Sequence, residues 1–169
     1  GGTDLDITLE GKTTRTDAGA TPVADDDTAT ATVSFDAGVT VTPDDVSSTV
    51  DRLPSNNAQV GGVGPFSYNA VFTVTNTGDG EDTFDLTETL ATGTNITITS
   101  ISSASVTLAA GANTQITVVY TVDDDATAGA TDFVQLNATS QGDGDVDDDG
   151  AIGVRVIRPS LSILKEVFA

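Results

Sequence analysis

Apolar and polar residues alternate along much of this chain, and this period of two restricts the fold more than any other feature. It is clearest in TDLDITLE (residues 3–10) and in QITVVYTV (residues 115–122). Successive side chains of a β-strand point to opposite faces, so each segment is typical of a half-buried strand. No segment shows a helical period. The sequence therefore predicts an all-β fold.

The same alternation predicts about nine or ten short strands, separated by turns rich in Gly, Asp and Asn. Their apolar positions are Leu5, Ile7, Leu9; Ala29, Ala31, Val33, Phe35; Tyr68, Ala70, Phe72, Val74; Phe84, Leu86; Ile96, Ile98; Val106, Leu108; Ile116, Val118, Tyr120, Val122; the less regular Phe133, Leu136, Ala138; and Ile152, Val154, Val156. This spacing is typical of an antiparallel β-sandwich, either immunoglobulin-like or jelly-roll.

A chain of 169 residues with 37% apolar content buries one good core, so we expect a single sandwich domain over 1–169. Within it, we expect N-terminal strands over 1–42 and an immunoglobulin-like core over 66–158. Residues 43–65 contain three prolines and a weak apolar pattern, which predicts a loop or junction. We expect residues 159–169 to form a C-terminal tail strand.

The composition excludes most known types of catalytic site. The chain has no His and no Cys, so neither Ser–His–Asp nor Cys–His catalysis is available, and we expect no enzyme.

The 26 acidic and 6 basic residues give a formal charge of −20, which disfavours nucleic acid and anionic membranes as partners. Two explanations fit the charge: a high-salt environment that screens it, or divalent cations bound at acidic loops.

The C-terminal half resembles a known group of modules. The segments are VFTVTNTGDGEDTFDLTE (71–88), SVTLAAGANTQITVVYTVDDDATAGATDFVQLNATS (105–140) and RPSLSILKEV (158–167). They are similar to immunoglobulin-like repeat modules of bacterial and archaeal surface proteins, of the conserved-repeat and NEW3 type. The resemblance implies cell-surface architecture and no chemistry of its own.

The start of the chain favours export. The chain begins with Gly1 and Gly2 and contains no methionine, which is expected if a leader has been removed. No apolar run is long enough to span a membrane as a helix, so no membrane insertion is expected. We expect a secreted, extracellular protein at the cell surface.

The acidic segment GDGDVDDDGAIG (142–153) is the sharpest local motif. Alternate carboxylates followed by a glycine match the first half of a calcium loop, so calcium is the candidate cofactor. The candidate ligands are Asp143, Asp145, Asp147 and Asp149. The Glu expected at the twelfth position falls on Val156, which excludes a standard EF-hand. The alternative is a solvated acidic hairpin, and we also interpret Asp79, Glu81 and Asp82 as a solvated turn.

The C-terminal tail SLSILKEVFA (160–169) is an apolar strand beyond the last strand expected of the module, IGVRVI. Its candidate assembly residues are Leu161, Ile163, Leu164, Val167 and Phe168, with the cations Arg158 and Lys165. A surplus apolar strand needs a partner edge, and insertion into a neighbouring subunit would build a homopolymer head to tail. The alternatives are pairing within its own sandwich, beside residues 5–9, and the start of another module.

Two N-glycosylation sequons occur, at Asn95 and at Asn137. They are weak signals in a Thr-rich chain. Taken together, the sequence predicts a structural subunit of an extracellular filament, sheath or surface layer that partners with itself. The main alternative is an adhesion or carbohydrate-binding module of a larger surface protein. A calcium-dependent glycosidase is a distant third.

Overall fold

A computed structural model describes residues 35–55, 66–90, 95–159 and 165. The described part of the chain is built from strands and turns, and it contains no helix long and apolar enough to cross a membrane. The strands are β1 (Val39–Thr42), β2 (Asp44–Arg52), β3 (Ser67–Asn76), β4 (Asp82–Leu90), β5 (Ile96–Ile101), β6 (Ser105–Leu108), β7 (Asn113–Val122), β8 (Thr131–Ser140) and β9 (Asp147–Val156).

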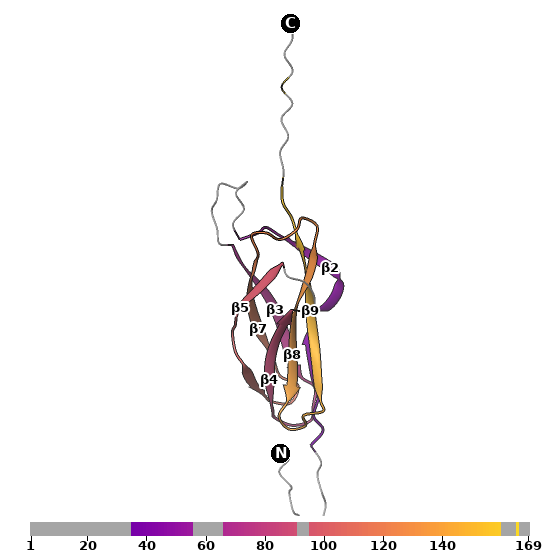
Figure 1. The fold of residues 1–169 in the computed structure, drawn as a ribbon. Coiled ribbons are helices and arrows are strands. Elements are labelled where there is room, and N and C mark those ends of the chain that lie inside the picture. The colour runs from indigo at the N-terminus through magenta and orange to yellow at the C-terminus, as the bar shows by residue number, and fades with distance from the viewer. Residues whose placement is uncertain (1–34, 56–65, 91–94, 160–164, 166–169) are drawn as a thin grey trace, which may run out of the picture. The chain divides into compact units, whose positions relative to one another are not determined.

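The strands form two sheets packed face to face (Figure 1). One sheet has four strands in the order β1-β3-β7-β5, and the other has five in the order β2-β9-β8-β4-β6. The first order matches the A-B-E-D sheet of an immunoglobulin domain, and β9-β8-β4 matches its G-F-C sheet. The predicted all-β, immunoglobulin-like sandwich is confirmed.

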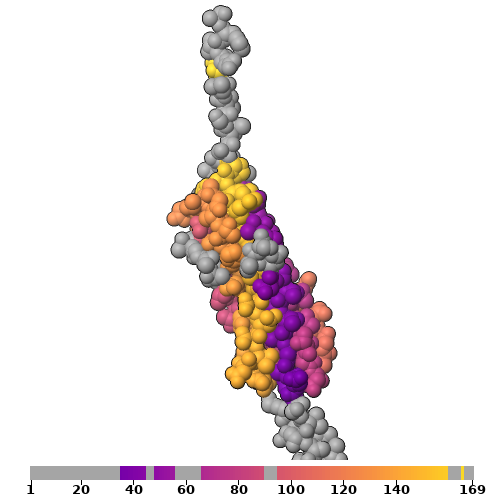
Figure 2. Space-filling model, turned by 90° about the vertical axis from the view of Figure 1, so that its right-hand side faces the viewer, coloured from indigo at the N-terminus to yellow at the C-terminus, as the bar shows by residue number. Residues whose placement is uncertain are grey.

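Strand β2 departs from the predicted loop over residues 43–65. It pairs in parallel with β9 at the edge of the five-stranded sheet, so this pair of described strands is not antiparallel. Figure 2 shows indigo residues of the N-terminal part of the sandwich beside the yellow surface of β9. Its sequence, DDVSSTVDR, has no regular apolar alternation, and its register shifts between Asp45 and Thr49. Strands were predicted from an apolar period of two. This irregular edge strand does not have that period, so the sequence did not indicate it.

The chain changes sheet at Pro43, which follows a cis peptide bond between β1 and β2. The proline nitrogen has no hydrogen to donate to either ladder. Its carbonyl accepts a hydrogen bond from the backbone N–H of Ala151, at 2.9 Å. The chain therefore crosses from one sheet to the other at this edge, early in its described part.

The core lies between the inner faces of the two sheets and is aliphatic and aromatic. Its fully buried large side chains are Val41, Phe72, Val74, Phe84, Val118, Tyr120, Val122, Val134, Leu136, Val154 and Val156. Most of these lie on the predicted alternations. The prediction for β8 was partly wrong, because its buried row is Val134, Leu136 and Ala138, whereas Phe133 is half-buried on the outer side.

The chain enters and leaves the sandwich at opposite ends (Figure 1). Near its start, the Asp36 carbonyl accepts a hydrogen bond from the N–H of Asp79, in the turn between β3 and β4. After β9, Arg158 binds the loop between β7 and β8. Contacts divide the chain into units 1–35 and 36–169. Of the N-terminal strands predicted over 1–42, the part in residues 1–34 lies outside the described residues, and the part described contains β1.

Gly150 of β9 packs tightly against the opposite sheet. A Cβ atom there would lie 2.8 Å from the Pro43 carbonyl oxygen, 2.8 Å from Val41 Cγ1 and 3.1 Å from Phe72 Cδ1. These distances leave no room for a methyl group. Sequence reasoning assigned this glycine to a calcium-loop turn. The structure places it inside a strand, where the packing of β1 and β3 requires it.

We expect Gly150→Ala to lower the free energy of unfolding by about 1–3 kcal/mol, because the added methyl overpacks the core. Chemical denaturation followed by circular dichroism measures this. The matched control is Gly144→Ala in the β8–β9 turn, where a Cβ would meet nothing within 4 Å. Equal stability of the Gly150→Ala variant and the wild-type chain would contradict the tight contact.

Candidate interaction surfaces

The four predicted calcium ligands do not converge. Asp143 and Asp145 lie in the turn between β8 and β9, where Asp143 Oδ1 accepts a hydrogen bond from the Asp145 N–H at 3.1 Å. Asp147 and Asp149 lie in β9 with exposed side chains, and Asp147 accepts a hydrogen bond from Asn137 Nδ2 at 3.0 Å. Among the described residues, no three acidic side chains form a metal-binding group. Calcium at this hairpin stays a prediction from sequence.

Asp82, interpreted from sequence as part of a solvated turn, is instead only 6% exposed and holds the β8–β9 turn in place. Its carboxylate accepts hydrogen bonds from Ser140 Oγ at 2.5 Å, Thr83 N at 2.7 Å and Gly142 N at 3.2 Å. A buried carboxylate is tolerated when donors satisfy it in this way. Asp82 is therefore a structural acceptor at this end of the sandwich.

Asn76, in the TNTG motif, is fully buried and ties two turns together. Its side-chain nitrogen donates to the Gly80 and Leu108 carbonyls, both at 2.8 Å, and its side-chain oxygen accepts from Gly78 N at 2.9 Å. The bonds join the β3–β4 turn to the end of β6. Sequence reasoning quoted this motif for its resemblance and missed its physical role, which depends on a partner 32 residues away.

We expect Asn76→Ala to lower the free energy of unfolding by about 2–4 kcal/mol, because the buried Leu108 carbonyl and the part-buried Gly80 carbonyl lose their donor. Urea denaturation of the variant measures the loss. Asn69→Ala, an exposed position on the same strand, is the matched control and is expected to change stability little. A wild-type midpoint for Asn76→Ala would show that the amide does not hold the two turns.

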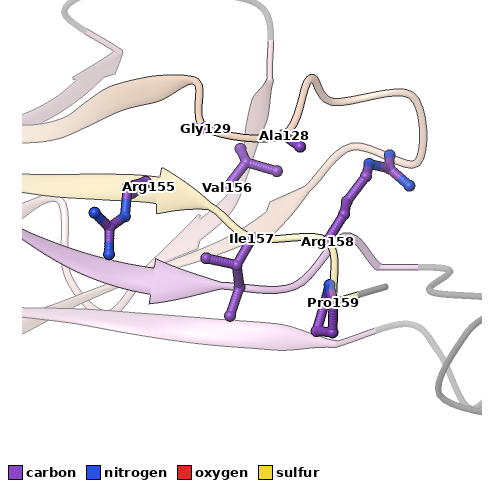
Figure 3. A pocket seen from close by; sticks show the side chains of 7 residues that line it. All are labelled: Ala128, Gly129, Arg155, Val156, Ile157, Arg158 and Pro159. Atoms are coloured by element: carbon purple, nitrogen blue, oxygen red, sulfur yellow. The ribbon is translucent and has the colours of Figure 1, made fainter. Parts of the chain in front are cut away.

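The opposite end of the sandwich contains an open groove where the chain leaves β9 (Figure 3). The groove has a volume of about 410 Å³ and is lined by Ala128, Gly129, Arg155, Val156, Ile157, Arg158 and Pro159. Arg158 Nε donates to the Ala126 carbonyl at 2.8 Å, and a second guanidinium nitrogen donates to the Asp124 carbonyl. The predicted assembly residue Arg158 thus anchors the exit of the chain to its own β7–β8 loop.

Lys165 is a second predicted assembly residue among the described residues, and it is exposed. Leu161, Ile163, Leu164, Val167 and Phe168 lie outside the described residues. The pairing of the tail stays a prediction from sequence.

Arg155 forms a bidentate ion pair with Asp51 across β9 and β2, with nitrogen–oxygen distances of 2.6 and 2.9 Å. The hydrogen bond from Arg155 lowers the pKa of the Asp51 carboxyl below its usual range. Because this pKa is depressed on folding, the contribution of the pair is present at neutral pH and is lost as the pH falls through that pKa. Both side chains are about half exposed, so the pair contributes little to stability.

A cluster of Arg52, Tyr68 and Tyr120 lies toward the same end, and sequence reasoning did not find it. The Arg52 guanidinium carbon lies 5.0 Å from the centre of the Tyr68 ring, and the two tyrosine rings are 5.8 Å apart. Tyr68 Oη donates to the Leu53 carbonyl and accepts from the Leu53 N–H, both at 3.1 Å. Burial raises the pKa of Tyr120. The cluster fixes the end of β2 on the core.

The two sequons differ in position. Asn95 immediately precedes β5, and its side-chain oxygen accepts a hydrogen bond from Thr127 N at 3.1 Å. Asn137 lies in the middle of β8, where its side-chain nitrogen donates to Asp147. A glycan acceptor requires an accessible loop, so the position of Asn137 within a paired strand fits the sequon less well than that of Asn95.

Comparisons with known proteins give no family. No family model matches the chain, and no curated protein is similar to it. The resemblance to conserved-repeat and NEW3 modules therefore stays a prediction.

Solved structures show remote similarity. The chain is similar to the secreted serine protease VesC from Vibrio cholerae, with 18% identity over 63% of this chain and 21% of that chain, at a TM-score of 0.40. It is similar to the PapD-like domain 7 of human CEP192, with 7% identity over 75% and 89% of the two chains, at 0.41. It is also similar to the CsuC–CsuE pilus pre-assembly complex of Acinetobacter baumannii, with 10% identity over 74% and 57%, at 0.34. These TM-scores carry no conclusion about function.

Proposed function

We propose that this protein is a structural subunit of an extracellular filament, sheath or surface layer, and that it is not an enzyme. The observation that carries the proposal is the path of the chain, which enters the sandwich beside the β3–β4 turn and leaves it at the opposite end, beside the β7–β8 loop. Because the chain enters and leaves such a module at opposite ends, the module can contact one neighbour at each end. Subunits arranged end to end then form a linear polymer.

The exit of the chain supports connection through the C-terminal tail. Arg158 is fixed by its hydrogen bonds to the Ala126 and Asp124 carbonyls, and the Ile157 N–H donates to the Arg52 carbonyl at 2.9 Å. The tail therefore starts from a rigid point. Its ten residues, 160–169, span about 33 Å when extended, which is the length of a long strand in this sandwich.

The proposed connection is insertion of the tail into a sheet of the next subunit. Leu161 and Ile163 alternate with Ser160 and Ser162, as in a half-buried strand, and Leu164, Val167 and Phe168 add apolar residues beyond this alternation. Four-residue β1 pairs only with residues 73–76 of β3, and no other described strand pairs with residues 67–72 on that side. This incomplete edge is an acceptor of the right kind for an added strand.

One observation favours a second candidate function, an adhesion or ligand-binding module of a larger surface protein. The groove around Arg155 and Arg158 is open and combines apolar walls with two cations. It would suit an acidic, partly apolar segment. This candidate predicts a monomer in solution.

Deletion of residues 160–169 tests the assembly. We expect the full chain to form polymers seen by negative-stain electron microscopy and sedimentation, and the deletion variant to stay folded without forming end-to-end polymers, because the connecting strand is gone. A Leu161→Asp, Ile163→Asp double variant is the control that keeps the length of the tail, and it is expected to form no end-to-end polymers either. Polymers formed without the tail would contradict the proposal.

A further inference from the structure

The charges of this acidic protein are sorted between its two sheets. The four strands of one sheet read VTVT, SYNAVFTVTN, ITITSI and NTQITVVYTV, and none contains Asp, Glu, Lys or Arg. Four of the five strands of the other sheet carry acidic residues: Asp44, Asp45, Asp51, Asp82, Asp85, Glu88, Asp132, Asp147, Asp148 and Asp149. In a chain with a formal charge of −20, one whole sheet is uncharged.

The outer side of the uncharged sheet, called here the neutral face, has an apolar centre and a polar surround. Val71 is 41% exposed, and it is the exposed large hydrophobic residue of the described chain. Val119 lies diagonally from it on the neighbouring strand, because Val71 pairs with Thr117 and Asn69 pairs with Val119. The surrounding outward residues are Thr40, Thr42, Ser67, Asn69, Thr73, Thr75, Thr97, Asn113, Gln115, Thr117 and Thr121.

This arrangement has the composition of a protein interface. The centres of interfaces are depleted in charged residues and hold the apolar contacts, and the rims are polar. Hydroxyl and amide side chains of the surround are both donors and acceptors, so two identical faces can satisfy one another. An isologous contact needs this self-complementarity.

The net charge of the chain indicates which partner binds the neutral face. Two copies of a chain with this net charge repel one another wherever their acidic surfaces meet. The neutral face is the side on which a second copy can approach without placing carboxylates opposite carboxylates. We propose that the neutral face binds the neutral face of a second copy, so that subunits associate side by side.

The available area is sufficient for such a contact. The strands of the sheet have 4, 10, 6 and 10 residues. At about 3.4 Å per residue and 4.8 Å between strands, they cover about 500 Å² in each copy and about 1,000 Å² in the pair. This reaches the lower bound of specific interfaces. The contact is therefore of the weak, reversible class that a lateral contact between polymers requires.

The experiment uses the full chain with Val71→Lys, which places a cation and its hydration at the centre of the neutral face. Thr87→Lys is the matched control, because Thr87 is exposed on β4 of the acidic sheet. Sedimentation equilibrium at moderate and high salt measures association. We expect the wild-type chain and Thr87→Lys to associate side by side, more strongly as salt screens the net charge. We expect Val71→Lys to weaken this association at least tenfold.

A second readout does not depend on the strength of association. The chain contains no cysteine, so Val71→Cys introduces a single thiol near the proposed axis, and Thr87→Cys introduces one on the other sheet. We expect a short bis-maleimide to link Val71→Cys chains in pairs and to link Thr87→Cys chains at least tenfold less.

The proposal does not depend on the tail. If end-to-end polymers fail to form but pairing through Val71 persists, the filament proposal is wrong and the lateral contact stands. If polymers form, Val71→Lys leaves their lateral association unchanged and Val71→Cys chains are not cross-linked in pairs, the lateral contact is wrong. Binding of the neutral face to an insoluble polysaccharide, with no pairing of chains at any salt concentration, would also overturn a second copy as the occupant.

Discussion

The packing of the two inner faces against one another is the constraint on which the rest of this structure depends. The core is formed by side chains from both sheets, with Phe72 and Tyr120 from one and Phe84 and Leu136 from the other among the largest fully buried residues. At Gly150 the sheets approach so closely that a single methyl group has no space. Because each sheet buries one face in this contact, the outer faces are free to differ.

The outer faces differ in charge. Carboxylates are concentrated on the strands of the five-stranded sheet and in the turns, and the four-stranded sheet has none in its strands. A uniform distribution of acidic residues would keep chains apart in every direction. With the observed distribution of charge, a second chain can approach across the neutral face. This direction of contact adds to the long axis along which the chain enters and leaves. A building block with two such directions is suited to a layered or bundled assembly.

The fold could be predicted largely from sequence, because strands β3 and β7 carry an uninterrupted period of two and their buried rows follow from it. Strand β2 could not, because its pairing with β9 depends on tertiary contact and its register is interrupted. The polar residues failed for a related reason. Asn76 and Asp82 lie in turn-like sequence, and their buried hydrogen bonds are made with Leu108 and Ser140, which lie 32 and 58 residues away.

The acidic hairpin shows why the spacing of acidic residues in a sequence does not by itself establish how their side chains are arranged. The spacing of Asp145, Asp147 and Asp149 suits a loop that turns around a cation, but Asp147 and Asp149 belong to β9, where extended backbone holds alternate side chains apart. The neutral face was missed because strand sequences had to be assigned to sheets before their charges could be compared.

The central claim, that these sandwiches are joined end to end through the tail, is tested most directly by electron cryomicroscopy of the assembled full chain. The account predicts a repeat along the long axis of the sandwich, with residues 160–169 of one subunit forming a strand in a sheet of the next. Single dispersed sandwiches, or polymers in which that segment pairs within its own subunit, would contradict it.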